Sequence, residues 1–136
     1  MRKIYSKINP KLLLGIINRL DDIPNGRLDI APDNEFMQVS SMKLDKKSFR
    51  PHKHIWKDGE KRIITQESWI VVKGSVKVTM YDLNDKVVDE SIINSGDISV
   101  TFQGGHTYEI LDDKTIVYEY KTGPYKGQEN DKVFIW

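Results

Sequence analysis

Short alternating segments, separated by turn residues, make up most of this 136-residue chain and limit its fold more than any other feature. Residues 76–80 alternate apolar and polar side chains, which is the period of a half-buried strand. Turn signals follow at residues 84–85 (Asn-Asp) and 94–97 (Asn-Ser-Gly-Asp). Short strands at such regular spacing predict an all-β sandwich or a closed barrel. We expect strands over residues 36–44, 52–56, 61–66, 67–73, 76–80, 87–93, 98–102, 108–111, 115–121 and 132–136.

The N-terminal segment departs from this pattern and predicts a short helix. Asn9 is a suitable N-cap and Pro10 a suitable first helical residue. Apolar side chains then recur at helical spacing, at Leu13, Ile16, Ile17 and Leu20. Turn residues at 21–27 (DDIPNGR) end the segment. We therefore predict a single domain over residues 1–136, with a helical segment over 1–26, a barrel over 36–122 and a C-terminal tail over 123–136. The tail should be loop-like over 123–131, and residues 121–127 should fold over one barrel end.

The composition excludes several classes of protein. The chain has no cysteine, so disulfides, thiolate metal sites and catalytic cysteines are excluded. A formal net charge of +1 argues against a dedicated nucleic-acid binder, whose domain is usually strongly basic. No apolar run approaches the roughly 20 residues of a membrane span. The short apolar run near the N-terminus lacks a small-residue cleavage site, so we expect it to be part of the fold and the protein to be cytoplasmic.

The chain has three histidines, His52, His54 and His106. The first two form an H-x-H pair, and side chains two residues apart on a strand share one face. Neutral imidazole nitrogens are good ligands for first-row divalent metals. Taken alone, an H-x-H pair is more often two ordinary surface or core histidines than a metal site. Its surroundings in the sequence change that weighting.

Glu67 follows the pair, and six residues then separate it from Gly74. Further along, a Gly96-Asp97 turn leads to Gly104-Gly105-His106. With these elements the chain resembles the cupin superfamily over roughly residues 49–120. The resemblance implies a jelly-roll β-barrel in which four residues hold one divalent metal ion, namely His52, His54, Glu67 and His106.

The chain departs from the cupin pattern in two places. The gap between His54 and Glu67 is longer than usual in the family, and an inserted hairpin around residues 58–59 would account for it. The second motif is one residue shorter, with Phe102 where proline is common and Ile110 where asparagine often stands. The sequence leaves open whether Glu67 or its neighbour Gln66 faces the site.

Three imidazoles and one carboxylate suit Fe, Mn, Ni, Co or Zn, and the ligand set does not distinguish among them. Trp69 and Tyr108 each lie two residues after an expected ligand, so they should face the same interior as pocket wall or as ordinary core. Arg50 is the basic residue best placed to enter the pocket. Residues 43–62 hold eight basic and three acidic residues, which would either steer an anionic ligand or protect solvated strand edges.

The resemblance implies a metal-dependent enzyme of small-molecule metabolism, such as an isomerase, an epimerase or an oxygenase. Small cupins of this kind are associated with bacterial surface-carbohydrate biosynthesis, which suggests a sugar-derived or phosphorylated metabolite. We expect Glu67 and Tyr108 to be catalytic. One alternative is a metal-free nucleotide-sugar isomerase or epimerase that uses the H-x-H pair for proton transfer. Another is a non-enzymatic small-molecule-binding module. The family also suggests a homodimer, formed through the N-terminal helix or the first strand, with no nucleic-acid or membrane partner.

Overall fold

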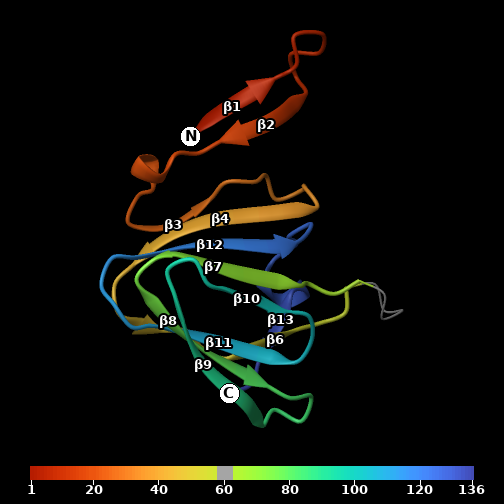
Figure 1. The fold of residues 1–136 in the computed structure, drawn as a ribbon. Coiled ribbons are helices and arrows are strands. Elements are labelled where there is room, and N and C mark those ends of the chain that lie inside the picture. Colours follow the sequence, from red (N-terminus) through yellow and green to blue (C-terminus); the bar gives the residue numbers. More distant parts are fainter. Residues whose placement is uncertain (58–62) are drawn as a thin grey trace.

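The structure, a computed structural model, describes residues 1–57 and 63–136 and is built from two facing β-sheets (Figure 1). The five-stranded sheet has the order β10 (Ile98–Thr101), β7 (Glu67–Lys73), β12 (Thr115–Thr122), β4 (Met37–Leu44) and β3 (Gly26–Asp29). The other sheet has the order β13 (Lys132–Phe134), β6 (His52–His54), β11 (Gly105–Ile110), β8 (Ser75–Tyr81) and β9 (Val87–Asn94), with β5 (Lys47–Ser48) also on β11.

The apolar core lies between the two sheets. Met42, Val71 and Val117 enter it from the five-stranded sheet, and Val78 and Ile110 enter it from the other. The burial pattern of β7 alternates from Glu67 to Val72, as expected for a strand with one face on a core. Val76 and Val78, from the alternation predicted over residues 76–80, enter the same core from β8.

Gly74 makes the turn that carries the chain from β7 in one sheet to β8 in the other. Its φ is +88°, a conformation that side chains rarely adopt, and a Cβ there would lie 2.3 Å from Thr115 Oγ1. Glycine at this position therefore satisfies both the backbone conformation and the close approach of β12. This explains why a glycine follows Glu67 at a fixed spacing.

Most of the predicted strands are confirmed, with different ends. The strand predicted over 108–111 is β11, which begins three residues earlier, at Gly105. The segment predicted over 61–66 forms no strand within its described residues, where Ile64 makes only an isolated bridge to Trp56. The inserted hairpin expected around residues 58–59 lies outside the described residues. The two sheets face each other without closing into one continuous barrel over the part of the chain that is described.

The predicted N-terminal helix is wrong. Residues Arg2–Tyr5 (β1) and Leu13–Ile17 (β2) form a separate two-stranded hairpin instead. Ser6 Oγ accepts hydrogen bonds from the backbone N–H groups of Ile8 and Asn9, and Asn9 Oδ1 accepts one from Lys11. Asn9 and Pro10 therefore build a turn rather than a helix start. The apolar residues that fit helical spacing fit strand pairing as well.

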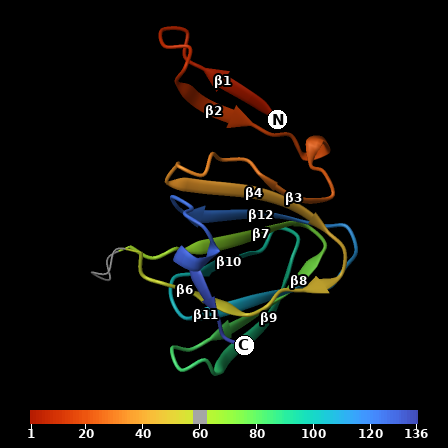
Figure 2. The ribbon, with the colours of Figure 1, turned by 180° about the vertical axis from the view of Figure 1, so that it is seen from behind.

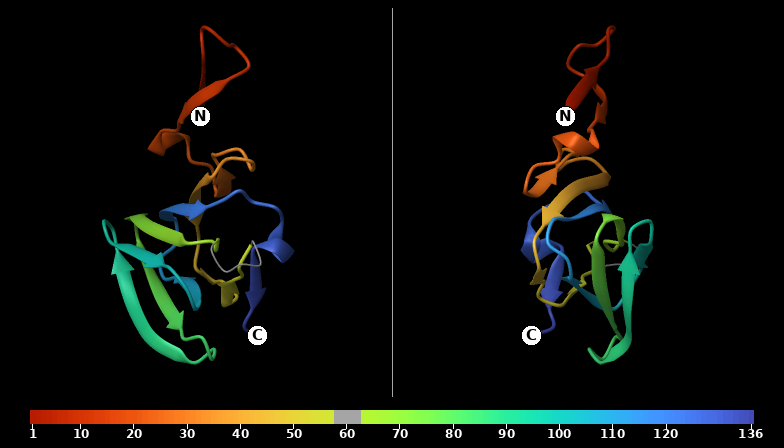
Figure 3. Two further views of the ribbon diagram at one scale, coloured as in Figure 1. Left: turned by 90° about the vertical axis from the view of Figure 1, so that its right-hand side faces the viewer. Right: turned by 60° about the vertical axis from the view of Figure 1, so that its left-hand side comes forward.

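The hairpin projects beyond the edge of the five-stranded sheet, and the C-terminus lies at the opposite end of the molecule (Figures 1 and 3). Two single-turn 3-10 helices, Leu20–Asp22 and Gln128–Asn130, complete the secondary structure of the described residues. The C-terminal tail runs along the edge of the second sheet, where β13 pairs with β6 as the edge strand (Figure 2). No helix within the described residues is long and apolar enough to cross a membrane.

Candidate metal centre

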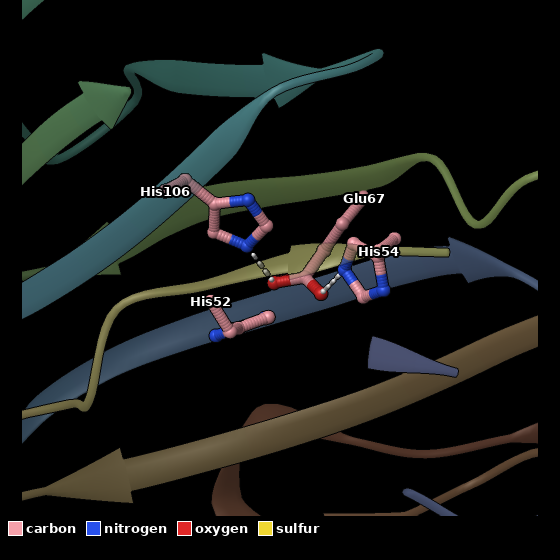
Figure 4. Close-up of side chains that lie close together, drawn as sticks. All are labelled: His52, His54, Glu67 and His106. Carbon is pink, nitrogen blue, oxygen red and sulfur yellow. Dashed lines mark hydrogen bonds and ion pairs between the residues drawn. The ribbon is translucent and has the colours of Figure 1, made fainter. Parts of the chain in front are cut away.

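Four buried side chains, His52, His54, Glu67 and His106, converge between the two sheets (Figure 4). His52 and His54 project from β6, and His106 on β11 lies directly opposite His52 in the antiparallel register. Glu67 is the first residue of β7 and comes from the facing sheet. Each of the four residues offers a ligand atom, and these atoms all lie within 4.8 Å of one another. The group therefore has the spacing of a site that could hold one metal ion.

The carboxylate of Glu67 lies between two of the imidazoles. Its Oε2 is 3.2 Å from His54 Nε2, and its Oε1 is 3.4 Å from His106 Nε2. The rings of His52 and His106 are close neighbours, with centroids 4.5 Å apart. The three imidazoles are thus gathered around the carboxylate oxygens of Glu67.

Several of these nitrogens have no hydrogen-bond partner among the described residues. They are Nε2 of His52 and both ring nitrogens of His106, and all are buried. A buried polar atom without a partner is costly, so such an atom usually indicates a missing ligand, ion or water. A divalent metal ion would satisfy the two Nε2 atoms, and the mixed nitrogen and oxygen donor set suits a first-row transition metal. The residues present therefore fit a metal ion.

Backbone carbonyls orient two of the rings from behind. Nδ1 of His52 lies 3.3 Å from the carbonyl oxygen of Arg50, and Nδ1 of His54 lies 3.2 Å from that of Asp131. A proton on Nδ1 would leave Nε2 with a free lone pair facing the centre. Hydrogen bonds of this kind commonly fix the tautomer and orientation of metal-binding histidines.

The protonation states of the four residues differ because their partners differ. Burial, followed by the neighbouring positive charges, lowers the pKa of His52 to about 3. Burial also opposes charge on His54, but hydrogen bonds to Asp131 and Glu67 outweigh it and raise the pKa of His54 to about 9. Burial opposes charge on Glu67 too, yet its contacts with His106 and His54 hold the pKa of this carboxyl well below its usual value. Glu67 is therefore a carboxylate, and the proton on His54 is one that a metal ion would displace.

Sequence reasoning missed Asp131, which supports His54 from the side away from the centre. Its Oδ2 lies 3.3 Å from His54 Nδ1, and Thr65 donates a hydrogen bond of 2.6 Å to its Oδ1. Lys57 Nζ is also within 3.5 Å of the same oxygen. Although burial opposes its charge, the hydrogen bonds with His54 and Thr65 and the positive charge of Lys121 lower the pKa of Asp131. No local motif marks this residue, because only the pairing of β13 with β6 brings it there.

A cavity of about 350 Å³ adjoins the four residues, with His52 and Glu67 in its wall. Trp69 and Tyr108, both predicted for this pocket, line it as a stacked pair with ring centroids 3.9 Å apart. The hydroxyl of Tyr108 lies 3.1 Å from Ser99 Oγ, and burial raises the pKa of this phenol. Tyr108 is therefore neutral at physiological pH, as a wall residue or a hydrogen-bond donor would be.

The cavity wall also contains two charged residues that sequence reasoning did not assign, Arg27 and Glu119. Trp69 Nε1 donates to both Glu67 Oε1 (3.0 Å) and Glu119 Oε2 (3.1 Å), so one N–H group links two buried carboxylates. Arg27 on β3 donates to Glu119 Oε1 at 2.7 Å. Glu119 is buried on β12 and lines the cavity.

The structure also places Gln66, Arg50 and part of the basic stretch 43–62. Gln66 is exposed, whereas Glu67 is buried in the site. Arg50 does not line the cavity, because its guanidinium lies over the ring of Phe134, 4.1 Å from the centroid, and it donates to the carbonyl oxygen of Trp136. In the basic stretch 43–62, Lys53 is paired with Asp85 and residues 58–62 are not described.

The comparisons with known proteins bear on the fold. No family model and no curated protein matches the sequence, but many solved structures match the fold. KdgF from Halomonas sp. superposes with a TM-score of 0.56 and 18% identity, covering 74% of this chain and 80% of that chain. The capsular polysaccharide assembling protein CapF from Staphylococcus aureus gives 0.64 and 17%, covering 79% of this chain and 29% of that chain.

Oxalate oxidase, solved in complex with the substrate analogue glycolate, gives a TM-score of 0.51 with 16% identity, covering 73% of this chain and 45% of that chain. This chain therefore spans most of KdgF, but less than a third of CapF and under half of oxalate oxidase. These neighbours are cupin-fold proteins, and at such identities the likeness establishes the fold. The chain therefore has the cupin fold, with a buried group of three histidines and one glutamate that could bind a metal ion.

Proposed function

We propose that the protein is a metal-dependent enzyme acting on a small, sugar-derived metabolite. One observation supports this most strongly: His52 and Glu67 belong both to the four-residue group and to the wall of the 350 Å³ cavity. A metal ion held there would be next to a space large enough for a small substrate. When bound, the metal would polarise a carbonyl or hydroxyl oxygen of that substrate.

The surrounding residues suit the roles predicted for them. Glu67 is kept anionic by its imidazole neighbours, so it could act as a ligand or accept a proton. The indole N–H of Trp69 holds the carboxylate of Glu67 in place, and the stacked Tyr108 forms the adjacent wall. The proposed catalytic role of Tyr108 is to donate a hydrogen bond to substrate, consistent with its neutral phenol.

The metal-free alternative is less well supported. Proton transfer by the H-x-H pair needs imidazoles that titrate near neutral pH. Burial is the main cause that lowers the pKa of His52 to about 3. Burial also opposes charge on His54, but the carboxylates of Asp131 and Glu67 outweigh it and raise the pKa of His54 to about 9. Neither ring is poised for exchange at pH 7, which favours metal ligation over acid–base catalysis by this pair.

The proposed link to carbohydrate metabolism comes from the sequence resemblance and from CapF, which is named for capsular polysaccharide assembly. For this chain the reaction is proposed to be an isomerisation, an epimerisation or an oxygenation. The many polar groups in the cavity wall, among them Arg27, Asp29, Gln38 and Glu119, favour a hydroxyl-rich substrate. The cytoplasmic location stays a prediction.

Elemental analysis of the purified protein tests this proposal directly. Wild-type protein should contain close to one equivalent of Fe, Mn, Ni, Co or Zn, and His54→Ala should contain little. Substoichiometric metal in both proteins, after growth and dialysis with each metal, would overturn the proposed function.

We infer that the protein associates as a homodimer through the β1–β2 hairpin rather than through a helix. β1 and β2 pair only with each other within the described residues, and their burial patterns are largely exposed. Leu14, for example, is 63% exposed. The outer face of the five-stranded sheet has a shallow apolar groove, lined by Phe36, Met37, Val100 and Tyr120. The hairpin and the groove adjoin, because Leu14 and Ile16 line a neighbouring hollow together with Phe36, Met37 and Tyr120, and both surfaces stay largely exposed.

Charge complementarity favours a second copy of this chain as the partner. The first 20 residues hold five of the chain's 21 basic residues and none of its 20 acidic residues. The remaining 116 residues therefore hold 16 basic and 20 acidic residues, and are net acidic. A basic, apolar hairpin from one copy thus suits the acidic body of another, and a two-fold symmetric exchange would bury both.

A further inference from the structure

The cations around the cavity fall into two groups that differ in how well they are neutralised. Arg27 is saturated, because it donates to Asp29 Oδ1 and Glu119 Oε1 at 2.7 Å each and also to Ser40 Oγ. Lys132 lines the same cavity, is about half-buried, and forms no ion pair with any described residue. A sheltered cation without a counter-charge is costly unless a ligand supplies one.

The strand register places Lys132 beside the metal centre. It lies directly opposite His54 where β13 pairs with β6, so the two side chains share one face of the sheet. Since His54 faces the interior, Lys132 faces it too. Lys132 is about half-buried there, and it lines the cavity that His52 and Glu67 also line.

A second lysine occupies the corresponding position on the facing sheet. Lys121 lies opposite Glu67 in the pairing of β12 with β7, and it also lines the cavity. Its Nζ is 3.9 Å from Asp131 Oδ2 and 4.9 Å from the ring centroid of Tyr125, so its contacts are loose. Asp131 is already shared with His54 and Thr65. Each sheet thus contributes one lysine opposite one of the four converging residues.

From this arrangement we infer that the cavity binds an anionic, hydroxyl-rich small molecule whose carboxylate or phosphate group pairs with Lys132 and Lys121. This inference rests on the proposed function, because it assigns the substrate class of the same site. The anionic group would lie between the two lysines, and the hydroxyl groups would reach the other polar residues of the wall, Arg27, Asp29 and Glu119. Arg27 cannot take the anionic group, since two carboxylates already occupy its guanidinium.

Calorimetric titration with three compounds of similar size tests the inference. Gluconate has a carboxylate, glucose 6-phosphate has a phosphate, and glucose has neither. At least one of the two anions should bind at least about tenfold more tightly than glucose, since a hydrogen bond to a charged group contributes roughly 1.5–3 kcal/mol. Which anion binds identifies the anionic group.

Substitutions then locate the binding. Lys132→Gln should reduce anion affinity about tenfold, to near that of glucose, whereas Lys132→Arg should retain most of it. Lys86→Gln, which removes an exposed lysine far from the cavity wall, should have no effect and serves as the matched control.

The inference would be overturned if glucose bound as tightly as both anions, if none of the three compounds bound, or if Lys132→Gln bound anions like the wild type. Metal content, measured on the same samples, separates this inference from the proposed function. Full metal occupancy without anion preference overturns only the substrate class. Anion preference in a protein that cannot be loaded with metal overturns only the metal-dependent function.

Discussion

Two antiparallel strand pairs in this molecule, β1–β2 and β6–β11, have opposite environments. The hairpin joins neighbours in sequence, is rich in leucine and isoleucine, and is mostly exposed. The pair β6–β11 joins segments about fifty residues apart, contains all three histidines, and buries them. A two-stranded hairpin is marginally stable on its own, whereas β6 and β11 have neighbours within their sheet and a facing sheet. Burial here follows from tertiary partners and not from side-chain hydrophobicity.

The largest expected difference between the two pairs is in metal affinity. His106→Ala removes one of four ligands, and it should lower the affinity by at least about 100-fold, the upper end of what losing an outer partner costs. Leu14→Gln in the hairpin should leave the affinity within about twofold of wild type, because it touches nothing near the centre. Competition titration with a metal-sensitive dye measures both. Equal loss in the two variants would break the comparison.

The two strand pairs should also differ in how much each contributes to the free energy of unfolding. Ile110 on β11 is 2% exposed, so Ile110→Ala should reduce the free energy of unfolding by about 2–5 kcal/mol. Leu14→Ala should change it by less than about 0.5 kcal/mol at low protein concentration, where the hairpin is solvated. Urea denaturation of both variants checks this. A large loss for Leu14→Ala in dilute protein would mean that the hairpin packs on its own barrel.

Self-association should depend on the β1–β2 hairpin and not on the β6–β11 pair. If the hairpin docks on a second copy, Leu14→Gln should weaken dimerisation by at least about tenfold, since it removes a leucine from both symmetry-related contacts. Leu83→Gln alters a similarly exposed leucine in the turn between β8 and β9, and this control substitution should not weaken dimerisation. Sedimentation velocity over a dilution series measures both. A monomer at every concentration contradicts the dimer, and binding to anionic vesicles instead would identify a membrane partner.

Metal binding between β6 and the facing sheet should also depend on pH. Burial opposes protonation of His54, but Asp131 and Glu67 outweigh it and raise its pKa to about 9. Below that pH the ring of the metal-free protein holds a proton that the metal must displace. Affinity should therefore rise by about tenfold per pH unit between about pH 7 and 9 and then level off. Asp131→Asn removes a partner that raises this pKa, so its affinity should level off at lower pH. A pH-independent affinity would contradict this assignment.

Sequence reasoning succeeded where the determining interactions are local. Alternation and turn residues predicted the sandwich strands, and the two-residue period placed His52 and His54 on one face. The fixed spacing from Glu67 to Gly74 reflects one strand and the turn that ends it. These features depend on the backbone conformation of a few consecutive residues.

Sequence reasoning failed where burial depends on distant partners. Leu13, Ile16 and Ile17 fit both a helix face and a strand, and pairing with β1 decided between them. Asp131 and Lys132 reach the centre only because β13 pairs with β6. Arg50 precedes β6 by two residues, yet it lies over Phe134 outside the cavity. No local pattern contains this information.

The most direct test of the account is an anomalous-difference map from crystals, collected at the absorption edge of the metal that the protein contains. The account predicts one strong peak per chain, between the two sheets and within coordination distance of His52, His54, Glu67 and His106. No peak at that position in metal-loaded crystals, or a peak held by other residues, would contradict it.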